Sequence, residues 1–251
     1  MKSREIHKSY RNVTSLKKSV DRLLKDSSLA PAFKITLFQL AKDIESAHSF
    51  WGDLRKRNGK RKTAIHADKL QIGGGRHYLE GFVNLDFFPP ADVIWDCRYG
   101  LPFRKESFKF VFSEHFFEHI DFPIAAKKVL REIYRVLEPG GSVLLGVPDG
   151  GKVVRAYYKK EKRFLDKLRD KCYSNRRPPV EIYGNLDLVN YLFRDQLDNP
   201  RYATHYWAYD EMSLGNLLKS IGFRKIKKTS FDKRYCNPKR KFYTLYMEAI
   251  K

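Results

Sequence analysis

Three glycines at the end of a short apolar segment are the first residues whose types and spacing suggest chemistry. Gly73, Gly74 and Gly75 follow the apolar positions Leu70 and Ile72. Glycine adopts positive φ angles without strain and lets a ligand approach the backbone closely. A strand that ends in such a turn indicates a nucleotide site, although the same turn also occurs in α/β domains that bind no nucleotide.

Two carboxylates follow at the ends of further apolar segments. Asp86 ends the segment 82–85, and Asp96 ends the segment 93–95. Carboxylates at strand ends can accept hydrogen bonds from ribose hydroxyls or from an exocyclic amine. A dinucleotide fingerprint would require a third glycine where Tyr78 stands, and an acidic residue about 20 positions further on. The spacing therefore argues against a nicotinamide cofactor.

The net charge of +21 belongs to the two ends of the chain. Residues 1–66 carry +10 and residues 151–251 carry +13, whereas residues 67–150 carry −2. Basic flanks suggest an anionic partner, such as nucleic acid, anionic membrane lipids or a phosphorylated acceptor. A highly charged, solvated surface explains the same numbers equally well.

The cysteines and the hydropathy pattern restrict the compartment. Cys97, Cys172 and Cys236 share no metal-ligand spacing and are too few for a disulfide framework, so we predict no metal centre and a reducing, cytoplasmic location. No run approaches 18 apolar residues, and residues 1–10 are polar. We therefore expect neither a transmembrane segment nor a secretory signal, which leaves peripheral membrane contact open.

Residues 1–66 predict a basic helical extension. Apolar residues recur at steps of three and four over about residues 31–55, and a shorter basic helix is predicted over about residues 15–25. Such an extension could cover the active site or dock on an anionic surface. It could also simply pack against its own domain, and we favour this reading.

Residues 67–251 predict one α/β domain, because strand and helix patterns alternate along it. A strand over 108–112, a helix with an apolar stripe over 126–137 and a strand over 143–147 follow the two carboxylates. A helix over 212–221 and two strands over 223–230 and 242–250 complete the domain. The predicted fold is a mainly parallel seven-strand sheet with helices on both faces, in the order 3-2-1-4-5-7-6, with the last strand antiparallel.

Residues 151–204 interrupt this alternation and are predicted to form a helical cap after the fifth strand. One basic helix is expected over about 153–168 and a second over about 186–197. Arg155, Arg176 and Arg177 are available to bind phosphate or carboxylate. Solvated helices that merely cover the sheet are an equally good explanation.

These motifs together resemble a known family. The glycine turn, the segment Glu80–Asp86, Asp96 followed by Leu101-Pro-Phe, the pair Glu118-His119 and the segment Arg135–Gly141 resemble S-adenosylmethionine-dependent methyltransferases of the seven-strand Rossmann-like class. They are most similar to the small type 11 methyltransferases associated with polysaccharide or cell-surface pathways. The resemblance covers about residues 67–150 and returns weakly at 205–223.

The resemblance implies roles for individual residues around the cofactor S-adenosylmethionine. Gly73, Gly74 and Gly75 would border its methionine part. Asp86 would bind the ribose with Phe87 beside the adenine. Asp96 and Cys97 would meet the adenine edge, and Ser113 would close the site.

Four side chains near predicted strand ends are candidates for a catalytic base. His115 and His119 follow the fourth strand, Asp149 follows the fifth, and His205 precedes the last helix. If the acceptor is a hydroxyl, a general base accelerates transfer by roughly 10² to 10⁴. Each histidine taken singly could instead be an ordinary hydrogen-bonded residue.

The acceptor is the least determined part of the prediction. The resemblance and the basic cap favour O-methylation of a sugar or surface glycan. Such an acceptor would be a small molecule or a glycan chain, and we expect it to be anionic. An RNA or other nucleic-acid methyltransferase is the alternative. Base-methylating enzymes usually carry Asp/Asn-Pro-Pro-aromatic where Ser113-Glu-His-Phe116 stands here, and no cysteine follows the fourth or fifth strand. A non-enzymatic binding module on this fold is the third possibility.

Overall fold

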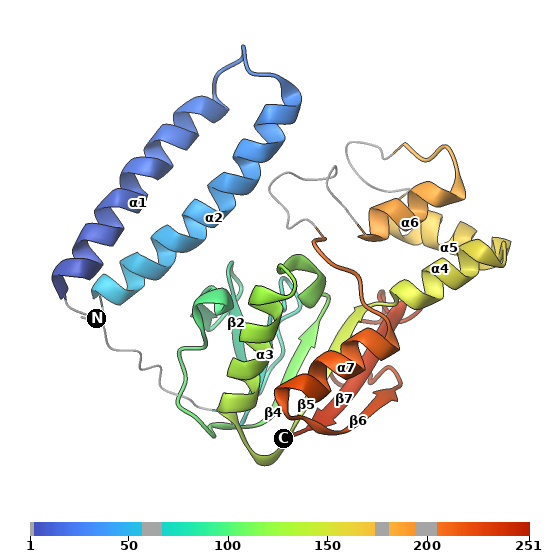
Figure 1. Ribbon diagram of the computed structural model, residues 1–251. Coiled ribbons are helices and arrows are strands. Elements are labelled where there is room, and N and C mark those ends of the chain that lie inside the picture. Colours follow the sequence, from blue (N-terminus) through green and yellow to red (C-terminus); the bar gives the residue numbers. More distant parts are fainter. Residues whose placement is uncertain (1–2, 57–66, 174–180, 194–204) are drawn as a thin grey trace.

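A computed structural model describes residues 3–56, 67–173, 181–193 and 205–251 (Figure 1). A helical hairpin precedes a twisted sheet, and a group of short helices lies beyond one end of the sheet. The strands are β1 (Lys69–Ile72), β2 (Val83–Asp86), β3 (Val93–Ile94), β4 (Phe108–Glu114), β5 (Leu137–Pro148), β6 (Arg224–Thr229) and β7 (Thr244–Ile250). The helices are α1 (Ser3–Leu24), α2 (Pro31–Lys56), α3 (Ile124–Val136), α4 (Gly150–Tyr158), α5 (Lys162–Cys172), α6 (Asn185–Phe193) and α7 (Glu211–Ile221), with 3-10 turns η1 (Cys97–Tyr99) and η2 (Phe117–His119).

The seven strands form one sheet in the order β3-β2-β1-β4-β5-β7-β6. The pairings among β1 to β5 are parallel, and the two pairings made by β7 are antiparallel. This confirms the predicted order and the mainly parallel sheet, with β7 as the exception. Because β1, β2 and β4 run in one direction, their carboxyl ends meet at one edge of the sheet.

In the described part of the chain, helices cover one face of the sheet and not both. The apolar sides of α3 and α7 pack on that face in the main core with strand residues such as Leu70, Val111 and Val143. The opposite face has its own cluster, which contains no residue from a described helix and includes Phe112, Leu144, Tyr246, Tyr235 and Cys236. The prediction of helices on both faces was wrong here because the connections 73–82 and 87–92 fall short of the dozen or more residues that a helical crossover needs.

The N-terminal hairpin is anchored to the domain. Val20 of α1 and Leu37 and Ile44 of α2 are buried together between the two helices. Ile6 and Trp51 join the main core of the domain. α2 matches its prediction, but α1 begins twelve residues earlier than expected, because the polar stretch before Ser15 is stabilised by packing against α2 and the domain. The predicted junction at residue 66 lies outside the described residues.

The insertion after β5 forms a separate small core. α4, α5 and α6 bury Val153, Leu165, Leu168 and Leu188 against one another. The single helix predicted over 153–168 is divided, because Lys160 adopts a φ of 54° between α4 and α5. Arg176 and Arg177 lie outside the described residues. None of the described helices is long and apolar enough to cross a bilayer.

Candidate active site

The glycine turn after β1 leaves the backbone bare at the carboxyl edge of the sheet. Gly73 has a φ of 69°, and a Cβ at this position would lie 2.3 Å from the ring of Phe116. Gly75 has a φ of 56°. A Cβ on Gly74 would lie 2.6 Å from the side-chain amide of Gln71. Space and backbone conformation therefore both require small residues here, at the edge where open α/β sheets bind ligands.

Asp86, at the end of β2, is hydrogen-bonded to the glycine turn and to the loop after β2. Its Oδ2 accepts a hydrogen bond from the Gly75 amide at 2.8 Å, and its Oδ1 accepts one from the Phe88 amide at 3.0 Å. An ionised carboxylate has about four acceptor positions, so two bonds leave capacity for ribose hydroxyls. Phe87 is half-buried next to it and makes an edge contact with Phe88.

Asp96 is buried after β3, and its carboxylate is bound by Arg98. Nε of Arg98 lies 3.0 Å from Oδ2 of Asp96, and Nη2 lies 2.9 Å from the same oxygen. Nη1 of Arg98 donates to Asp43 of α2. Sequence analysis missed Arg98, for which the spacing of two residues from Asp96 was the available signal. Burial raises the pKa of the adjacent Cys97 thiol well above its usual value, so Cys97 is a neutral wall residue.

Two buried polar atoms near the turn have no hydrogen-bond partner among the described residues. They are Oε1 of Gln71 on β1 and Oγ of Ser113 on β4. Nε2 of Gln71 donates to the carbonyl of His77 at 2.8 Å, and this bond fixes the orientation of the side-chain amide. Oε1 then remains as the acceptor. Buried acceptors without partners are costly, and a ligand with an ammonium group would satisfy Gln71. The turn, Asp86 and these two atoms fit a cofactor that joins an amino acid to a nucleoside.

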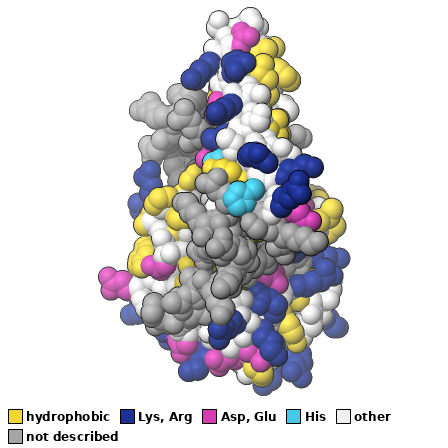
Figure 2. Space-filling model, turned by 90° about the vertical axis from the view of Figure 1, so that its left-hand side faces the viewer, with side chains coloured by type: hydrophobic (Ala, Val, Ile, Leu, Met, Phe, Trp, Pro, Cys, Tyr) yellow, Lys and Arg dark blue, Asp and Glu magenta, His cyan; other side chains and the backbone are white. Residues whose placement is uncertain are grey.

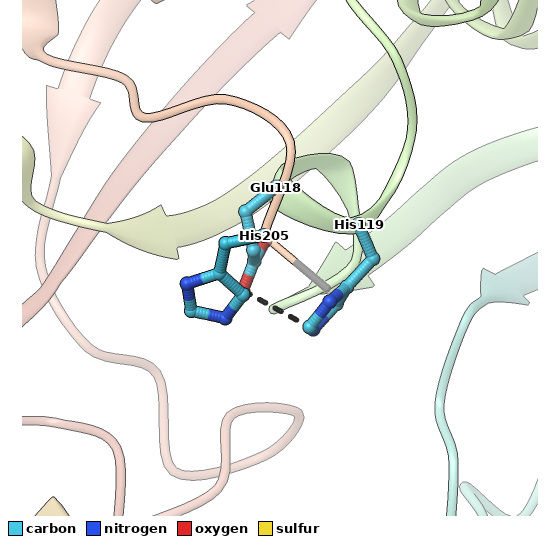
Figure 3. Close-up of side chains that lie close together, drawn as sticks. All are labelled: Glu118, His119 and His205. Carbon is cyan, nitrogen blue, oxygen red and sulfur yellow. Dashed lines mark ion pairs between the residues drawn. The ribbon is translucent and has the colours of Figure 1, made fainter. Parts of the chain in front are cut away.

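A cluster of ionisable side chains lies beyond β4. His115, with a φ of 54°, ends the strand, and η2 then presents Glu118 and His119. His205 comes from the segment before α7, and the amide of Tyr206 donates to the Glu118 carbonyl at 2.7 Å. Glu118, His119 and His205 point toward one another (Figure 3). The rings of His119 and His205 are 4.8 Å apart at their centroids.

Burial sets the electrostatics of this cluster. Burial raises the pKa of Glu118 to about 8. Burial, with the charge of Arg240 as a second cause, holds the pKa of His115 well below its usual value. Oε1 of Glu118 lies 3.4 Å from Nδ1 of His115 and 3.9 Å from Nε2 of His119. The environment therefore disfavours the charged forms of Glu118 and His115.

The structure brings three of the four predicted bases together and separates the fourth. His115, His119 and His205 meet around Glu118, a residue that sequence analysis named only as part of the family motif. Asp149 lies at the end of β5, where its Oδ1 caps α4 by accepting from the Lys152 amide at 2.8 Å. Phe116 connects the two halves of the site, because its ring lies over Gly73 and its neighbours in the chain belong to the cluster.

Comparison with known protein families identifies one part of the chain. Residues 86–145 match the family model of a methyltransferase domain. No curated protein matches the chain. The strand order and the glycine turn are those of a Rossmann-like fold of class I, and the family match identifies residues 86–145 as part of a methyltransferase domain. The chain is an S-adenosylmethionine-dependent methyltransferase, and S-adenosylmethionine is its cofactor.

Solved structures similar to this chain are distant. A methyltransferase of Thermotoga maritima, described as a possible histamine N-methyltransferase, has 16% identity over 75% of this chain and 84% of its own, with a TM-score of 0.43. One from Archaeoglobus fulgidus has 16% identity, covering 80% and 92%, at 0.44. Phosphoethanolamine N-methyltransferase 2 of Haemonchus contortus, solved with S-adenosyl-L-methionine, has 15% identity, covering 79% and 51%, at 0.40.

Proposed function

We propose that the protein O-methylates an anionic acceptor, a sugar or surface glycan, with the acceptor hydroxyl placed against His119 and His205. The observation that carries this proposal is the paired imidazoles beside buried Glu118, next to the cofactor turn. Amine acceptors already have a nucleophilic lone pair, whereas a hydroxyl gains most from a group that takes up its proton. Paired imidazoles at the transfer position therefore favour an oxygen acceptor.

The chain's own residues divide the work. Bound S-adenosylmethionine supplies a methyl group on a sulfonium, and transfer forms an O–CH₃ bond while the electron pair of the broken S–CH₃ bond stays on sulfur. We propose that Gly73 to Gly75 border the methionine part, with Asp86 on the ribose. Phe87, Asp96, Cys97 and Ser113 complete the pocket. His119 or His205 accepts the proton that the hydroxyl loses, and Phe116 aligns the two halves and excludes water.

A basic groove in the cap supports an anionic acceptor. It has a volume of about 500 Å³ and lies between α5 and the β6–β7 connection. Its lining is mostly cationic and aromatic, and consists of Lys152, Phe164, Lys167, Lys171, Pro238, Lys239, Lys241 and Phe242. Lys152 lies in the first turn of α4, which begins two residues after β5 ends, so one end of the groove lies near the carboxyl end of β5. The lysines that line this groove could bind the phosphate or carboxylate groups of an acceptor.

An RNA or other nucleic-acid acceptor is the second candidate, favoured by the charges of the two flanks. Figure 2 shows Lys and Arg side chains over both the hairpin and the lower part of the molecule, with Asp and Glu among them. The described part of this face thus spreads its cations rather than gathering them into one patch. We propose that the flanks support contact with an anionic surface, a membrane approached from the cytoplasm or a nucleic acid.

Transfer of a labelled methyl group tests the acceptor. Sugar nucleotides, cell-surface glycan extracts and total RNA should be compared with the wild type and with the variants His119→Ala and His205→Ala. We expect label in the glycan or sugar fraction, and strongly reduced transfer in both variants. His7→Ala, on α1, is the matched control and should transfer normally. Label found only in RNA would replace the glycan proposal with the second candidate.

A further inference from the structure

The cluster of Glu118, His119 and His205 has the composition of a metal site. One ligand atom from each residue lies within 4.8 Å of the others. Glu118 is 1% exposed, and neither of its carboxylate oxygens accepts a hydrogen bond from any described residue. Buried carboxylates are normally paired, hydrogen-bonded or bound to a metal. Glu118 has two imidazoles as neighbours and no lysine or arginine of the described chain within ion-pair distance.

One hydrogen bond of His205 fixes the tautomer of its ring. Its Nδ1 lies 2.8 Å from the carbonyl oxygen of Leu192 in α6. A carbonyl can only accept, so Nδ1 carries the hydrogen and the lone pair of the neutral ring is on Nε2. Histidines that bind metals usually donate their other nitrogen to a carbonyl or carboxylate in this way. The contact with α6 also orients the ring.

His115 places a second acceptor atom beside the carboxylate of Glu118. The hydroxyl of Thr244 donates to the Arg240 carbonyl at 2.7 Å, so it accepts from Nε2 of His115 at 2.8 Å. Nδ1 of neutral His115 then carries a lone pair, and it faces Oε1 of Glu118 at 3.4 Å. Two acceptors that face each other repel, unless a cation or a proton lies beside them.

We propose that Glu118, His119 and His205 bind one divalent first-row transition metal, with His115 behind Glu118. One carboxylate and two imidazoles are a common ligand set for catalytic zinc and for related metals, and they leave at least one position for another ligand. Zinc lies about 2.0 to 2.2 Å from such ligands, so binding draws the three side chains slightly closer together. The proposal replaces the expectation of no metal centre, which rested on the cysteine spacing alone.

The open position gives the metal a role, and this step rests on the proposed function. An acceptor hydroxyl that coordinates there has a lowered pKa and loses its proton to water, while the oxygen becomes a better nucleophile for the methyl group. The imidazoles then act as ligands and not as the proton acceptor. Metal dependence of the transfer separates these two roles of the same histidines.

Metal binding is measured first, without cofactor or acceptor. The purified full-length protein is stripped with a chelator and titrated with Zn²⁺, Mn²⁺ and Mg²⁺ by calorimetry, and its metal content is measured by mass spectrometry. We expect one equivalent of Zn²⁺ or Mn²⁺ and weaker Mg²⁺, because imidazoles favour the transition metals. Glu118→Gln and His205→Ala should each weaken binding by at least roughly tenfold, and His7→Ala should not.

Thermal unfolding of each variant shows whether the variant is folded. Metal should raise the Tm of the wild type and leave that of Glu118→Gln unchanged, although Gln fits the same space. No stoichiometric binding, or equal binding in the wild type and both cluster variants, would overturn the site. Binding without any methyl transfer would keep the site and reject the proposed function. Transfer that survives complete metal removal would reject the metal's catalytic role and leave an imidazole as the base.

Discussion

Arg98 of the domain and Asp43 of α2 form an ion pair in which Nη1 lies 2.7 Å from Oδ1. The same guanidinium forms an ion pair with Asp96, whose side chain is 6% exposed. Asp96 lies on the adenine side of the proposed cofactor pocket. Arg98 therefore connects the N-terminal hairpin to the pocket wall. We therefore expect a displacement of α2 to affect the position of Asp96.

Replacing Arg98 should affect stability and cofactor binding together. Arg98→Ala leaves the buried Asp96 carboxylate without its charged donor, and a lost bond to a charged group costs about 1.5 to 3 kcal/mol. We expect urea denaturation to show a loss of this size and calorimetry to show weaker binding of S-adenosylhomocysteine. Asp43→Asn removes only the exposed half of the bridge, and its loss of about 0 to 1 kcal/mol is the control. A wild-type midpoint for Arg98→Ala would contradict this prediction.

Asp86 should be required for cofactor affinity. Asp86→Ala removes a charged acceptor proposed for the ribose, a loss of about 1.5 to 3 kcal/mol, or at least tenfold in Kd. It also removes the bond to the Gly75 amide that holds the glycine turn. Calorimetry with S-adenosylmethionine measures the change. Asp68→Ala, an exposed carboxylate before β1, is the matched control, and equal affinity for the two variants would show that the ribose lies elsewhere.

Gly73 should be intolerant of any side chain, for two separable reasons. An alanine there would need a φ of 69°, which costs about 1 to 2 kcal/mol, and would also overlap the Phe116 ring. Gly140→Ala has the same kind of backbone strain, with a φ of 79°, but open space around its Cβ. We expect Gly73→Ala to lose cofactor binding and Gly140→Ala to lose only stability. Partial recovery in Gly73→Ala/Phe116→Ala would confirm the steric part.

The order of the strands was predictable because each parallel strand is a short apolar run followed by a glycine or a carboxylate. What covers each face of the sheet was not predictable. The second face is covered by residues such as Tyr235 and Cys236, which follow β6 in a polar stretch of sequence. The start of α1 was missed for the same reason, because its helical state depends on tertiary packing rather than on its own pattern.

Within the site, local motifs identified the cofactor half better than the acceptor half. Gly73 and Asp86 follow strands directly, so their neighbourhood is set by nearby sequence. His205 meets Glu118 across more than 80 positions of the chain, and this meeting depends on the bond between the Tyr206 amide and the Glu118 carbonyl. No periodicity reports such a contact. Arg98 was missed because an Asp and an Arg two residues apart are common on any charged surface.

The basic groove should control affinity for the acceptor and leave the chemical step unchanged. Lys167 and Lys171 line the groove from α5, whereas the histidine cluster and the cofactor turn lie on other elements. Reversing both charges, in Lys167→Glu/Lys171→Glu, removes ionic contacts worth about 0.2 to 1 kcal/mol each and adds repulsion, so KM for an anionic acceptor should rise roughly tenfold with little change in kcat. The difference should shrink at high salt, because ions screen exposed charges. Lys105→Glu/Lys128→Glu, at exposed lysines before β4 and on α3, changes the net charge by the same amount and is the control. If the control raises KM as much as Lys167→Glu/Lys171→Glu does, the acceptor responds to the charge of the whole protein and the groove is not its binding site.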